Sequence, residues 1–342
     1  MGRPPERNRR VYVLGAGLSC AFRLPNTQQL IDEALVEAPA TQAKSLQERL
    51  TSAQRVLYPD SSSPGFKPDV VDFFASFRLF RTIGSRLPET GVEEPDETYR
   101  ALSNAITRML VARMKSADER DALARHQVLD EITQPGNIVI TTNWDTLVEW
   151  SAIKRRVPMR FAAQGTGSFS SAELTVLKLH GSIDWCGKGS TKRSDTRENY
   201  GPLWELLNGK RNRRLPPPKG EGSVRRVRWD NSGTWQRLRG SYSEPYIVTM
   251  ATGKDDELGP LQQVWVDAYH ALSRASSIDI IGYSMPPDDA EVRTLLRAGI
   301  KRGPSEPKVR VQNPAPDVHQ RIRAHLVNQF ESDYTYVPGP NR

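Results

Sequence analysis

Residues 10–19 read Arg-Val-Tyr-Val-Leu-Gly-Ala-Gly-Leu-Ser, and this stretch decides the fold. Its β-branched and aromatic start predicts a short buried strand over residues 10–14. Gly15 and Gly17 then frame a tight turn, and the apolar spacing beyond Ser19 suits a helix. A strand, a glycine turn and a helix N-terminus together form the phosphate-binding start of a doubly wound α/β sheet.

Further strands follow along the chain as runs rich in valine, isoleucine and threonine. Such runs predict buried parallel strands, because both faces of these strands lie in the core. The predicted strands cover residues 137–142, 174–179, 246–250, 277–281 and 308–312. We therefore predict an α/β fold, a Rossmann-like open parallel sheet with a mostly helical insertion and a basic, loop-rich insertion.

The two insertions divide the sheet domain into the segments 1–40, 131–187 and 242–342. Residues 41–130 carry apolar side chains at helical spacing, which predicts the mostly helical insertion. The basic insertion is residues 188–241. Between 188 and 240 it holds 14 basic and 5 acidic side chains, so this excess of nine positive charges accounts for the net charge of +8 of the whole chain.

Composition excludes several classes of protein. The chain has 342 residues, 37% hydrophobic and 26% charged, which is too apolar for a disordered protein. No apolar run approaches the roughly 18 residues that a membrane helix needs. The two cysteines, Cys20 and Cys186, cannot build a disulfide framework or a four-cysteine zinc site. We expect a cytoplasmic protein without a secretory or lipidation signal, without membrane contact and without a metal ion.

Polar or glycine-rich residues follow four of the predicted strands. These segments are Gly15–Ser19, Thr141–Asp145, Lys178–Ser182 and Gly282–Ser284. In an open parallel sheet, ligands bind beyond the carboxyl ends of the strands. If the strands are neighbours, the four segments converge on one crevice, which is the predicted ligand site.

The order of these motifs resembles the sirtuin family. The shared features are the Gly-Ala-Gly turn, a T-x-N-x-D strand end (Thr141, Asn143, Asp145), a His-Gly strand end (His180, Gly181), a Gly-x-Ser strand end and the late Asn313. The resemblance covers both ends and the middle of the chain, but not residues 41–130 or 188–240. It implies an NAD-binding domain that cleaves the bond between nicotinamide and ribose.

Three departures separate this sequence from the protein-deacylating sirtuins. The interval that holds their four-cysteine zinc module contains only Cys186, their Gln-Asn pair is Thr142-Asn143, and Arg23-Leu-Pro-Asn26 replaces their Pro-Asp-Phe-Arg segment. Leu-His-Gly-Ser-Ile-Asp-Trp at 179–185 and Ile-Gly-Tyr-Ser-Met-Pro-Pro-Asp-Asp at 281–289 look instead like the zinc-free bacterial sirtuin-like domains that hydrolyse NAD in anti-phage defence.

NAD cleavage needs little acid catalysis, because the pyridinium is already a good leaving group. It needs a stabilised ribosyl cation and an oriented water in a site that excludes solvent. Asn143 can hold water or a ribose hydroxyl, His180 is a suitable general base, and Asp145 can hold the nicotinamide amide or stabilise the cation. Of the predicted NAD-binding residues, Gly15, Ala16, Gly17 and Ser19 would hold the pyrophosphate. Ser284 and Asn313 would hold the adenosine ribose or phosphate. Thr142 and Gly282 complete the predicted set.

Each motif also has an interpretation without a ligand. A Gly-Ala-Gly turn can serve only helix–strand packing, Asn143 and Asp145 can cap the following helix, and His180 can be satisfied within the fold. These interpretations require three unrelated coincidences in family order, so we favour a site. For the basic insertion 188–240, its arginines and tryptophans are typical of single-strand nucleic-acid binding, while a solvated loop or a protein-docking surface fits equally.

The expected function is hydrolysis of NAD to nicotinamide and ADP-ribose, in an NAD-depleting effector of bacterial anti-phage defence. Because unregulated NAD hydrolysis is toxic, we expect control by assembly into a homo-oligomer or by a partner. The resemblance implies a HerA-type ATPase or an Argonaute-like protein as such a partner. Two alternatives stay open. One is an NAD-dependent protein deacylase or ADP-ribosyltransferase, and the other is a non-catalytic module that senses NAD or ADP-ribose or binds nucleic acid.

Overall fold

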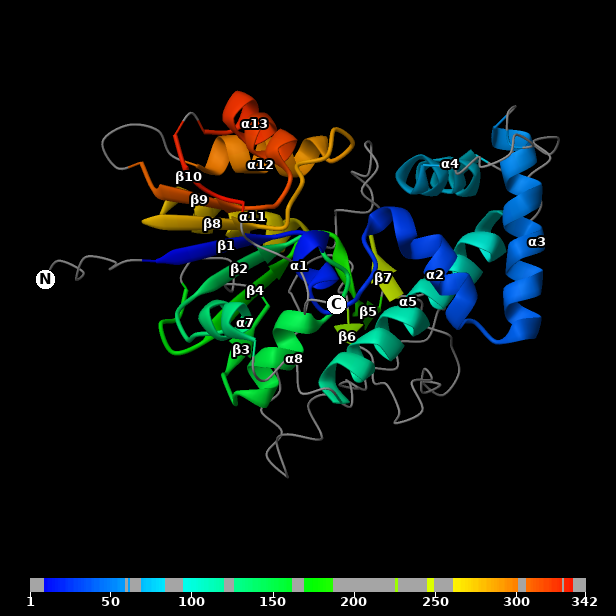
Figure 1. Ribbon diagram of the computed structural model, residues 1–342, viewed down its shortest axis with the longest axis horizontal. Helices are drawn as coiled ribbons and strands as arrows, with labels where there is room; N and C mark the ends of the chain where they lie inside the picture. The colour runs from blue at the N-terminus through cyan, green and yellow to red at the C-terminus, as the bar shows by residue number, and fades with distance from the viewer. Residues whose placement is uncertain are drawn as a thin grey trace, which may run out of the picture.

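The computed structural model describes residues 9–58, 61, 69–83, 95–119, 126–161, 169–186, 225–226, 245–248, 261–300, 306–327 and 329–334. Within these residues the chain forms a parallel sheet with helices on both faces, a group of helices beside it and a small second sheet (Figure 1).

The main sheet has seven strands, all parallel, in the order β10-β9-β8-β1-β2-β4-β3. Their bounds are β1 Arg10–Leu14, β2 Ile138–Thr141, β3 Met159–Arg160, β4 Leu174–Lys178, β8 Ser277–Ile281, β9 Lys308–Gln312 and β10 Glu331–Asp333. Strand β1 lies between β2 and β8, so the chain winds away from it in both directions. This reversal of strand order defines a doubly wound sheet. The predicted Rossmann-like α/β class is confirmed.

Side chains of the central strands alternate between two hydrophobic cores, one on each face of the sheet. Tyr12 and Leu14 belong to the core that α7 and α8 cover, and Val11 and Val13 to the core that α11, α12 and α13 cover. In Figure 1 the strands are stacked from β10 at the top to β3 at the bottom, with α12 and α13 near β9 and β10, and with α7 and α8 near β4 and β3. The bounds of these helices are α7 Gln127–Ile132, α8 Leu147–Lys154, α11 Gln262–Ser273, α12 Ala290–Gly299 and α13 Pro316–His325.

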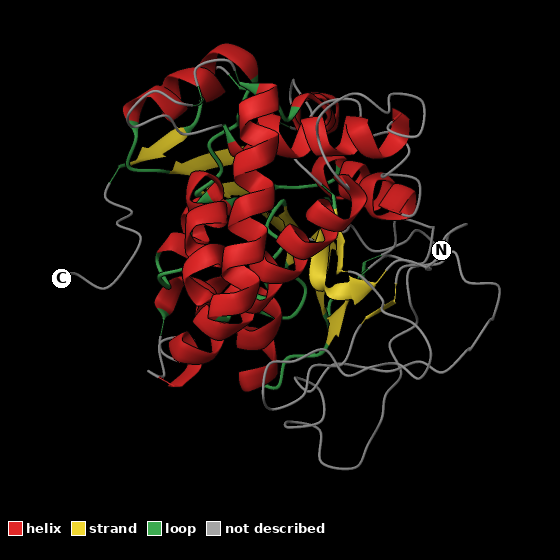
Figure 2. Ribbon diagram, turned by 90° about the vertical axis from the view of Figure 1, so that its right-hand side faces the viewer, coloured by secondary structure: helices red, strands yellow, loops and turns green. Residues whose placement is uncertain are grey.

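A group of helices lies beyond the carboxyl ends of the strands, where Figure 2 shows it in front of the sheet. These elements are α1 Ala16–Cys20, the short 3₁₀ helix η1 Thr27–Gln29, α2 Leu30–Glu37, α3 Ala40–Leu57, α4 Val70–Ile83 and α5 Pro95–Glu119. Helices α2, α3 and α4 all pack on α5. Phe74 of α4 makes edge-to-face ring contacts with Tyr99 at 5.9 Å and with Trp144 at 6.0 Å, which join this group to the end of β2.

The second sheet is antiparallel, with the order β6-β5-β7. Its strands are β5 Gly181–Cys186, β6 Arg225–Arg226 and β7 Pro245–Ile247. The strand expected at 246–250 therefore forms in part as β7, but it pairs with β5 instead of joining the parallel sheet. Gly181, with φ of +72°, lets the chain turn from β4 into β5 directly.

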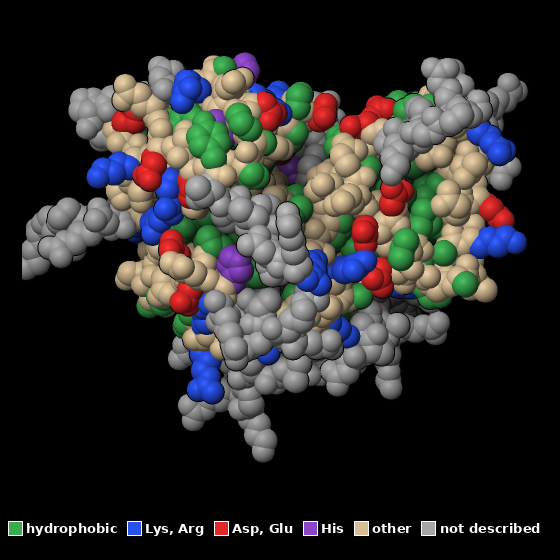
Figure 3. All heavy atoms as spheres, viewed as in Figure 1, with side chains coloured by type: hydrophobic (Ala, Val, Ile, Leu, Met, Phe, Trp, Pro, Cys, Tyr) green, Lys and Arg blue, Asp and Glu red, His purple; other side chains and the backbone are tan. Residues whose placement is uncertain are grey.

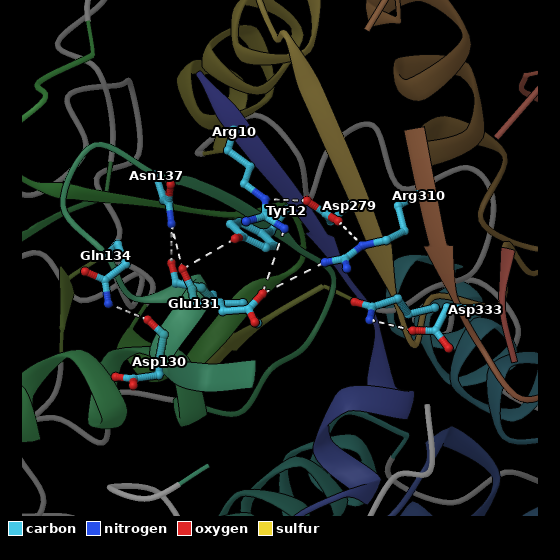
Figure 4. Close-up of polar contacts among 11 residues, drawn as sticks. Arg10, Tyr12, Asp130, Glu131, Gln134, Asn137, Asp279, Arg310 and Asp333 are labelled. Carbon is cyan, nitrogen blue, oxygen red and sulfur yellow. Dashed lines mark hydrogen bonds and ion pairs between the residues drawn. The ribbon is translucent and has the colours of Figure 1, made fainter. Parts of the chain in front are cut away.

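An ion-pair network crosses the middle of the sheet on the α7 side (Figure 4). Asp279 of β8 is 3% exposed and accepts hydrogen bonds from Arg10 Nε at 2.7 Å and from Arg310 Nε at 2.6 Å. The Glu131 carboxylate lies 3.8 Å and 3.9 Å from the same two guanidinium groups. The buried carboxylate is thus paired on both sides, as a buried charge requires. Beside it, burial raises the pKa of Tyr12 to about 12.

Candidate functional site

A pocket of about 410 Å³ lies at the carboxyl ends of the strands. Loops after β1, β2, β8 and β9 form one side of it, and η1 with the start of α4 forms another. Figure 3 shows the surface hollowed between the part that carries α12 and α13 and the helices α3 and α4. Six residues of the predicted NAD site line the pocket: Ala16, Gly17, Thr142, Gly282, Ser284 and Asn313.

The turn after β1 packs directly on the turn after β8. A Cβ atom at Gly17 would lie 2.7 Å from Gly282 Cα, and one at Gly282 would lie 2.3 Å from Leu18 N. Gly282 also has φ of +61°, a conformation that residues with a Cβ atom rarely adopt. The close approach of the two backbones therefore requires glycine at both positions.

Two N–H groups of the turn after β1 are used within the protein. The Gly15 N–H donates to Ile281 O at 3.1 Å, and the Gly17 N–H donates to Gly282 O at 2.9 Å. Both bonds tie β1 and α1 to the end of β8. In this arrangement neither N–H is available to a ligand phosphate, so the two glycines shape the pocket through backbone packing.

Asn143 follows β2, and its amide is fixed by the turn after β1. Nδ2 donates to Gly15 O and to Ser19 Oγ, both at 3.0 Å. Because Gly15 O can only accept, the amide nitrogen must face it. Oδ1 is buried and has no hydrogen-bond partner among the described residues. Asn143, Ala16 and Asp145 are among the residues that line a cavity of about 30 Å³, enough for a water molecule.

Asp145 lies beside Asn143 and is 7% exposed. Its Oδ2 accepts from Ser19 Oγ at 2.6 Å, and its Oδ1 accepts from the N–H of Leu147 at 3.0 Å, at the start of α8. The Ser19 hydroxyl therefore links Asn143 to Asp145 and lines the small cavity. Ser19, which the sequence analysis assigned to a pyrophosphate, lies among the predicted catalytic residues.

His180 is fully buried behind the wall of the large pocket. Its Nε2 lies 3.3 Å from Oδ1 of Asp289, a residue of the loop between β8 and α12 that belongs to the pocket lining. The Tyr283 hydroxyl donates to the other carboxylate oxygen of Asp289 at 3.5 Å. Burial and the Asp289 charge raise the pKa of Tyr283 well above its ordinary value, so this hydroxyl stays a donor. Asp289 therefore lies between the pocket and His180 and contacts both.

The electrostatic character of the large pocket is negative. Asp288 and Asp289 line it, and its described lining contains no lysine or arginine. Carboxylates in a pocket lining favour a positive charge on a ligand or in a transition state. Cys20 also lines the pocket. Burial and the Asp145 carboxylate raise the pKa of its thiol, so Cys20 is a neutral thiol at neutral pH rather than a nucleophilic thiolate.

Sequence reasoning did not identify Asp289, Tyr283 or the η1 wall as parts of the site. The only signal for Asp289 was its place in the Pro-Pro-Asp-Asp run after the Gly-x-Ser strand end. On the η1 side, Gln28 Nε2 donates to Asp69 Oδ2 at 3.0 Å and joins this wall to α4. Of the basic insertion, only residues 225–226 are described, so its predicted nucleic-acid contact lies outside the described residues.

Fold and site together define an α/β protein with a pocket at the switch point of a doubly wound sheet. No protein-family model matches the chain, and no curated protein matches it in sequence. Solved structures of Sir2 enzymes, the sirtuins, are similar to it. A complex described as "Sir2-p53 peptide-NAD+" is 15% identical, with 96% of this chain and 88% of that chain covered and a TM-score of 0.35.

Two further solved structures give similar values. One, described as "Structural Basis for the Mechanism and Regulation of Sir2 Enzymes", is 15% identical, covers 96% of this chain and 86% of its own, and has a TM-score of 0.35. The other, "The Structural basis of Sirtuin Substrate Affinity", is 14% identical, with 96% and 90% covered and a TM-score of 0.31. The α/β fold class rests on the strand order of this chain itself.

The described residues offer neither a membrane-spanning helix nor a cluster of metal ligands. None of their helices has the length and apolar character to span a bilayer. Within the same ranges, His, Cys, Asp and Glu side chains form no group of three or more that could hold a metal ion.

Proposed function

We propose that this protein hydrolyses NAD to nicotinamide and ADP-ribose. The observation that carries the proposal is Asn143: its buried Oδ1 has no hydrogen-bond partner among the described residues, and the residue lines a water-sized cavity beside the large pocket. The two cavities share Ala16 and Thr27 in their linings. A water held at Asn143 is therefore next to a substrate bound in the large pocket.

The large pocket suits a ligand with a cationic end. Its volume of about 410 Å³ lies in the range of small-molecule sites. The nicotinamide ring of NAD is positively charged, and Asp288 and Asp289 supply negative charge in the pocket lining. The same carboxylates stabilise the ribosyl cation that forms when this ring leaves.

In the proposed reaction, the bond between the nicotinamide nitrogen and ribose C1′ breaks, and its electron pair goes to the nicotinamide ring. The ribosyl cation then takes the oxygen of a water molecule. Asn143 orients that water by accepting a hydrogen bond from it through Oδ1. The released proton passes to the His180–Asp289 pair, with Asp289 as the member in the pocket wall, and then to solvent.

Nicotinamide release from NAD by the purified protein tests the proposal. We expect release without any peptide, and a loss of at least about 100-fold in Asn143→Ala and in His180→Ala. Release only with an acetyl-lysine peptide contradicts hydrolysis and points to a deacylase. No release, with NAD binding retained in calorimetry, contradicts hydrolysis by the isolated chain and points to a sensor or to a missing partner.

Matched controls distinguish the site from general loss of stability. The Asn137 amide also donates to two carbonyls, at 2.8 Å and 3.3 Å, but at the other end of β2. Asn137→Ala should lower the melting temperature and leave nicotinamide release intact. His126 packs against Phe22, with ring centroids 4.7 Å apart, and is not part of either cavity lining. His126→Ala is the matched control for His180→Ala, and it should likewise lower the melting temperature and leave nicotinamide release intact.

The proposal extends to control of the activity, because a free NAD hydrolase depletes the NAD of its own cell. We place the protein in anti-phage defence, held inactive or activated by homo-oligomer assembly or by a partner such as a HerA-type ATPase or an Argonaute-like protein. The rate of nicotinamide release per chain, measured against protein concentration with the mass followed by light scattering, tests control by assembly. A constant rate per chain while the mass changes contradicts it.

A further inference from the structure

A charged pair is buried in the core directly beneath the loop that carries Asn143. Lys178 is the last residue of β4 and Glu149 lies in the first turn of α8. Their side chains are each 1% exposed, and Nζ lies 3.0 Å from Oε1. Alternation along β4 puts Lys178 on the same face as Leu174 and Val176, among apolar side chains. A buried ion pair here is no more stabilising than apolar residues of similar size.

Lys178 has a second contact that an apolar residue cannot replace. Its Nζ also donates to the backbone carbonyl of Asp145. A buried carbonyl that loses its donor is costly, so this bond holds the middle of the loop 142–146 against the end of β4. The neighbouring Trp144 carbonyl accepts from the Ile183 N–H at 3.0 Å, so β4 and β5 hold the loop at two successive residues.

We infer that Lys178 and Glu149 form a positioning pair for the site, an inference that rests on the proposed NAD hydrolysis. Lys178 fixes the loop through the Asp145 carbonyl, and Glu149 supplies the counter-charge that allows Lys178 to be buried there. A displacement of Asp145 is transmitted through the Ser19 hydroxyl to the Asn143 amide, because Ser19 contacts both side chains. The Asn143 oxygen then no longer holds water at the correct place.

This role predicts a particular kinetic effect. The loop residues that Lys178 fixes line the small cavity, whereas Gly282, Ser284 and Asn313 of the large pocket come from other strands. Substrate binding should therefore change little, while the chemical step slows. A misplacement of about 1 Å in an active site costs about 100-fold in rate. We expect kcat to fall by about that factor and KM to stay within about threefold.

The test is the double variant Lys178→Met with Glu149→Leu, which removes both charges and restores an apolar core. We expect it to fold, with a melting temperature lowered because the Asp145 carbonyl loses its donor, and to lose about 100-fold in kcat. The matched control is Arg160→Met with Glu173→Leu, an ion pair of 2.8 Å at the opposite end of β4. This control should keep the full rate. A double variant that keeps the full rate overturns the inference.

The single variant Glu149→Gln should lose stability and keep its rate. It tests the role of Lys178 if the double variant does not fold. It leaves Lys178 and its bond to the Asp145 carbonyl in place, but leaves a buried charge without its counter-charge. We expect a lower melting temperature with kcat retained in the folded protein. A folded Glu149→Gln protein whose kcat falls as far as that of the double variant contradicts the assignment of loop positioning to Lys178.

Hydrogen exchange separates this inference from the proposed function. The N–H groups of Asn143 and Leu147 are bonded within the loop, to Thr141 Oγ1 at 3.1 Å and to Asp145 Oδ1 at 3.0 Å. In the double variant their exchange should rise by about tenfold or more, while that of the β1 core amides stays unchanged. If the unaltered protein releases no nicotinamide, the proposed function fails, and this measurement alone decides the loop role. Unchanged exchange at both amides overturns the positioning role of Lys178.

Discussion

Replacing Asp289 with asparagine removes a carboxylate that joins His180 to the large pocket. The Asp289 Oδ1 atom lies 3.3 Å from His180 Nε2, and both side chains are fully buried. Asparagine has nearly the same shape and can still accept from the Tyr283 hydroxyl. The variant Asp289→Asn therefore changes charge at this position and leaves packing nearly unchanged.

The size of the effect follows from the distance. At an effective dielectric constant of about 20, opposite unit charges 3.3 Å apart attract by about 5 kcal/mol. This is an upper bound on what the Asp289 charge contributes to a positive charge that forms at this distance during the reaction. It corresponds to a rate factor of about 10³ to 10⁴, which agrees with the range of about 10² to 10⁴ for general acid–base catalysis. We expect kcat for nicotinamide release to fall by about 10²- to 10⁴-fold.

The assay compares nicotinamide release, NAD binding by calorimetry and the melting temperature in the unaltered protein and in Asp289→Asn. We expect the rate to fall by a much larger factor than NAD binding weakens, while the melting temperature changes little. Asp288→Asn, which removes the neighbouring pocket carboxylate, should have a smaller effect because no described contact joins it to His180. A full rate in Asp289→Asn refutes the reasoning, as does a loss explained entirely by weaker NAD binding.

Three other perturbations test the packing and polar contacts. Gly282→Ala should lower the free energy of unfolding in urea by about 2–4 kcal/mol, because its Cβ would lie 2.3 Å from Leu18 N, whereas Gly136→Ala, with its closest contact at 3.2 Å, should cost less. Asn143→Asp puts a carboxylate oxygen against Gly15 O, so it should abolish nicotinamide release and cost about 1–3 kcal/mol of stability. Burial raises the pKa of Tyr12 to about 12, so its stabilising contribution is complete below pH 10 and disappears as the pH rises from 10 to 12. Tyr12→Phe should therefore lose less stability than the unaltered protein over that interval, by about 3 kcal/mol, and equal losses in urea titrations would contradict this.

The sequence determined the sheet because the signals for its main strands are local. Residues 10–14, 277–281 and 308–312 became β1, β8 and β9 with the predicted bounds, since unbroken β-branched runs suit strands with two buried faces. Short strands gave no such signal: β3 has two residues, and β10 is Glu-Ser-Asp. The pairing of β7 with β5 depends on a partner distant in sequence, so no local pattern indicated it.

The candidate site was also predictable only in part from the sequence. Strand-end motifs in the sequence indicated which residues gather at the carboxyl edge, because parallel strands must end on the same side. Contacts across that edge were decided only by the tertiary structure. In the tertiary structure, the Gly15 and Gly17 N–H groups donate to carbonyls at the end of β8. Ser19 lies between Asn143 and Asp145, and Asp289 contacts His180. A hydrogen bond between residues more than 100 positions apart depends on how whole elements pack, and that information is absent from any local stretch of sequence.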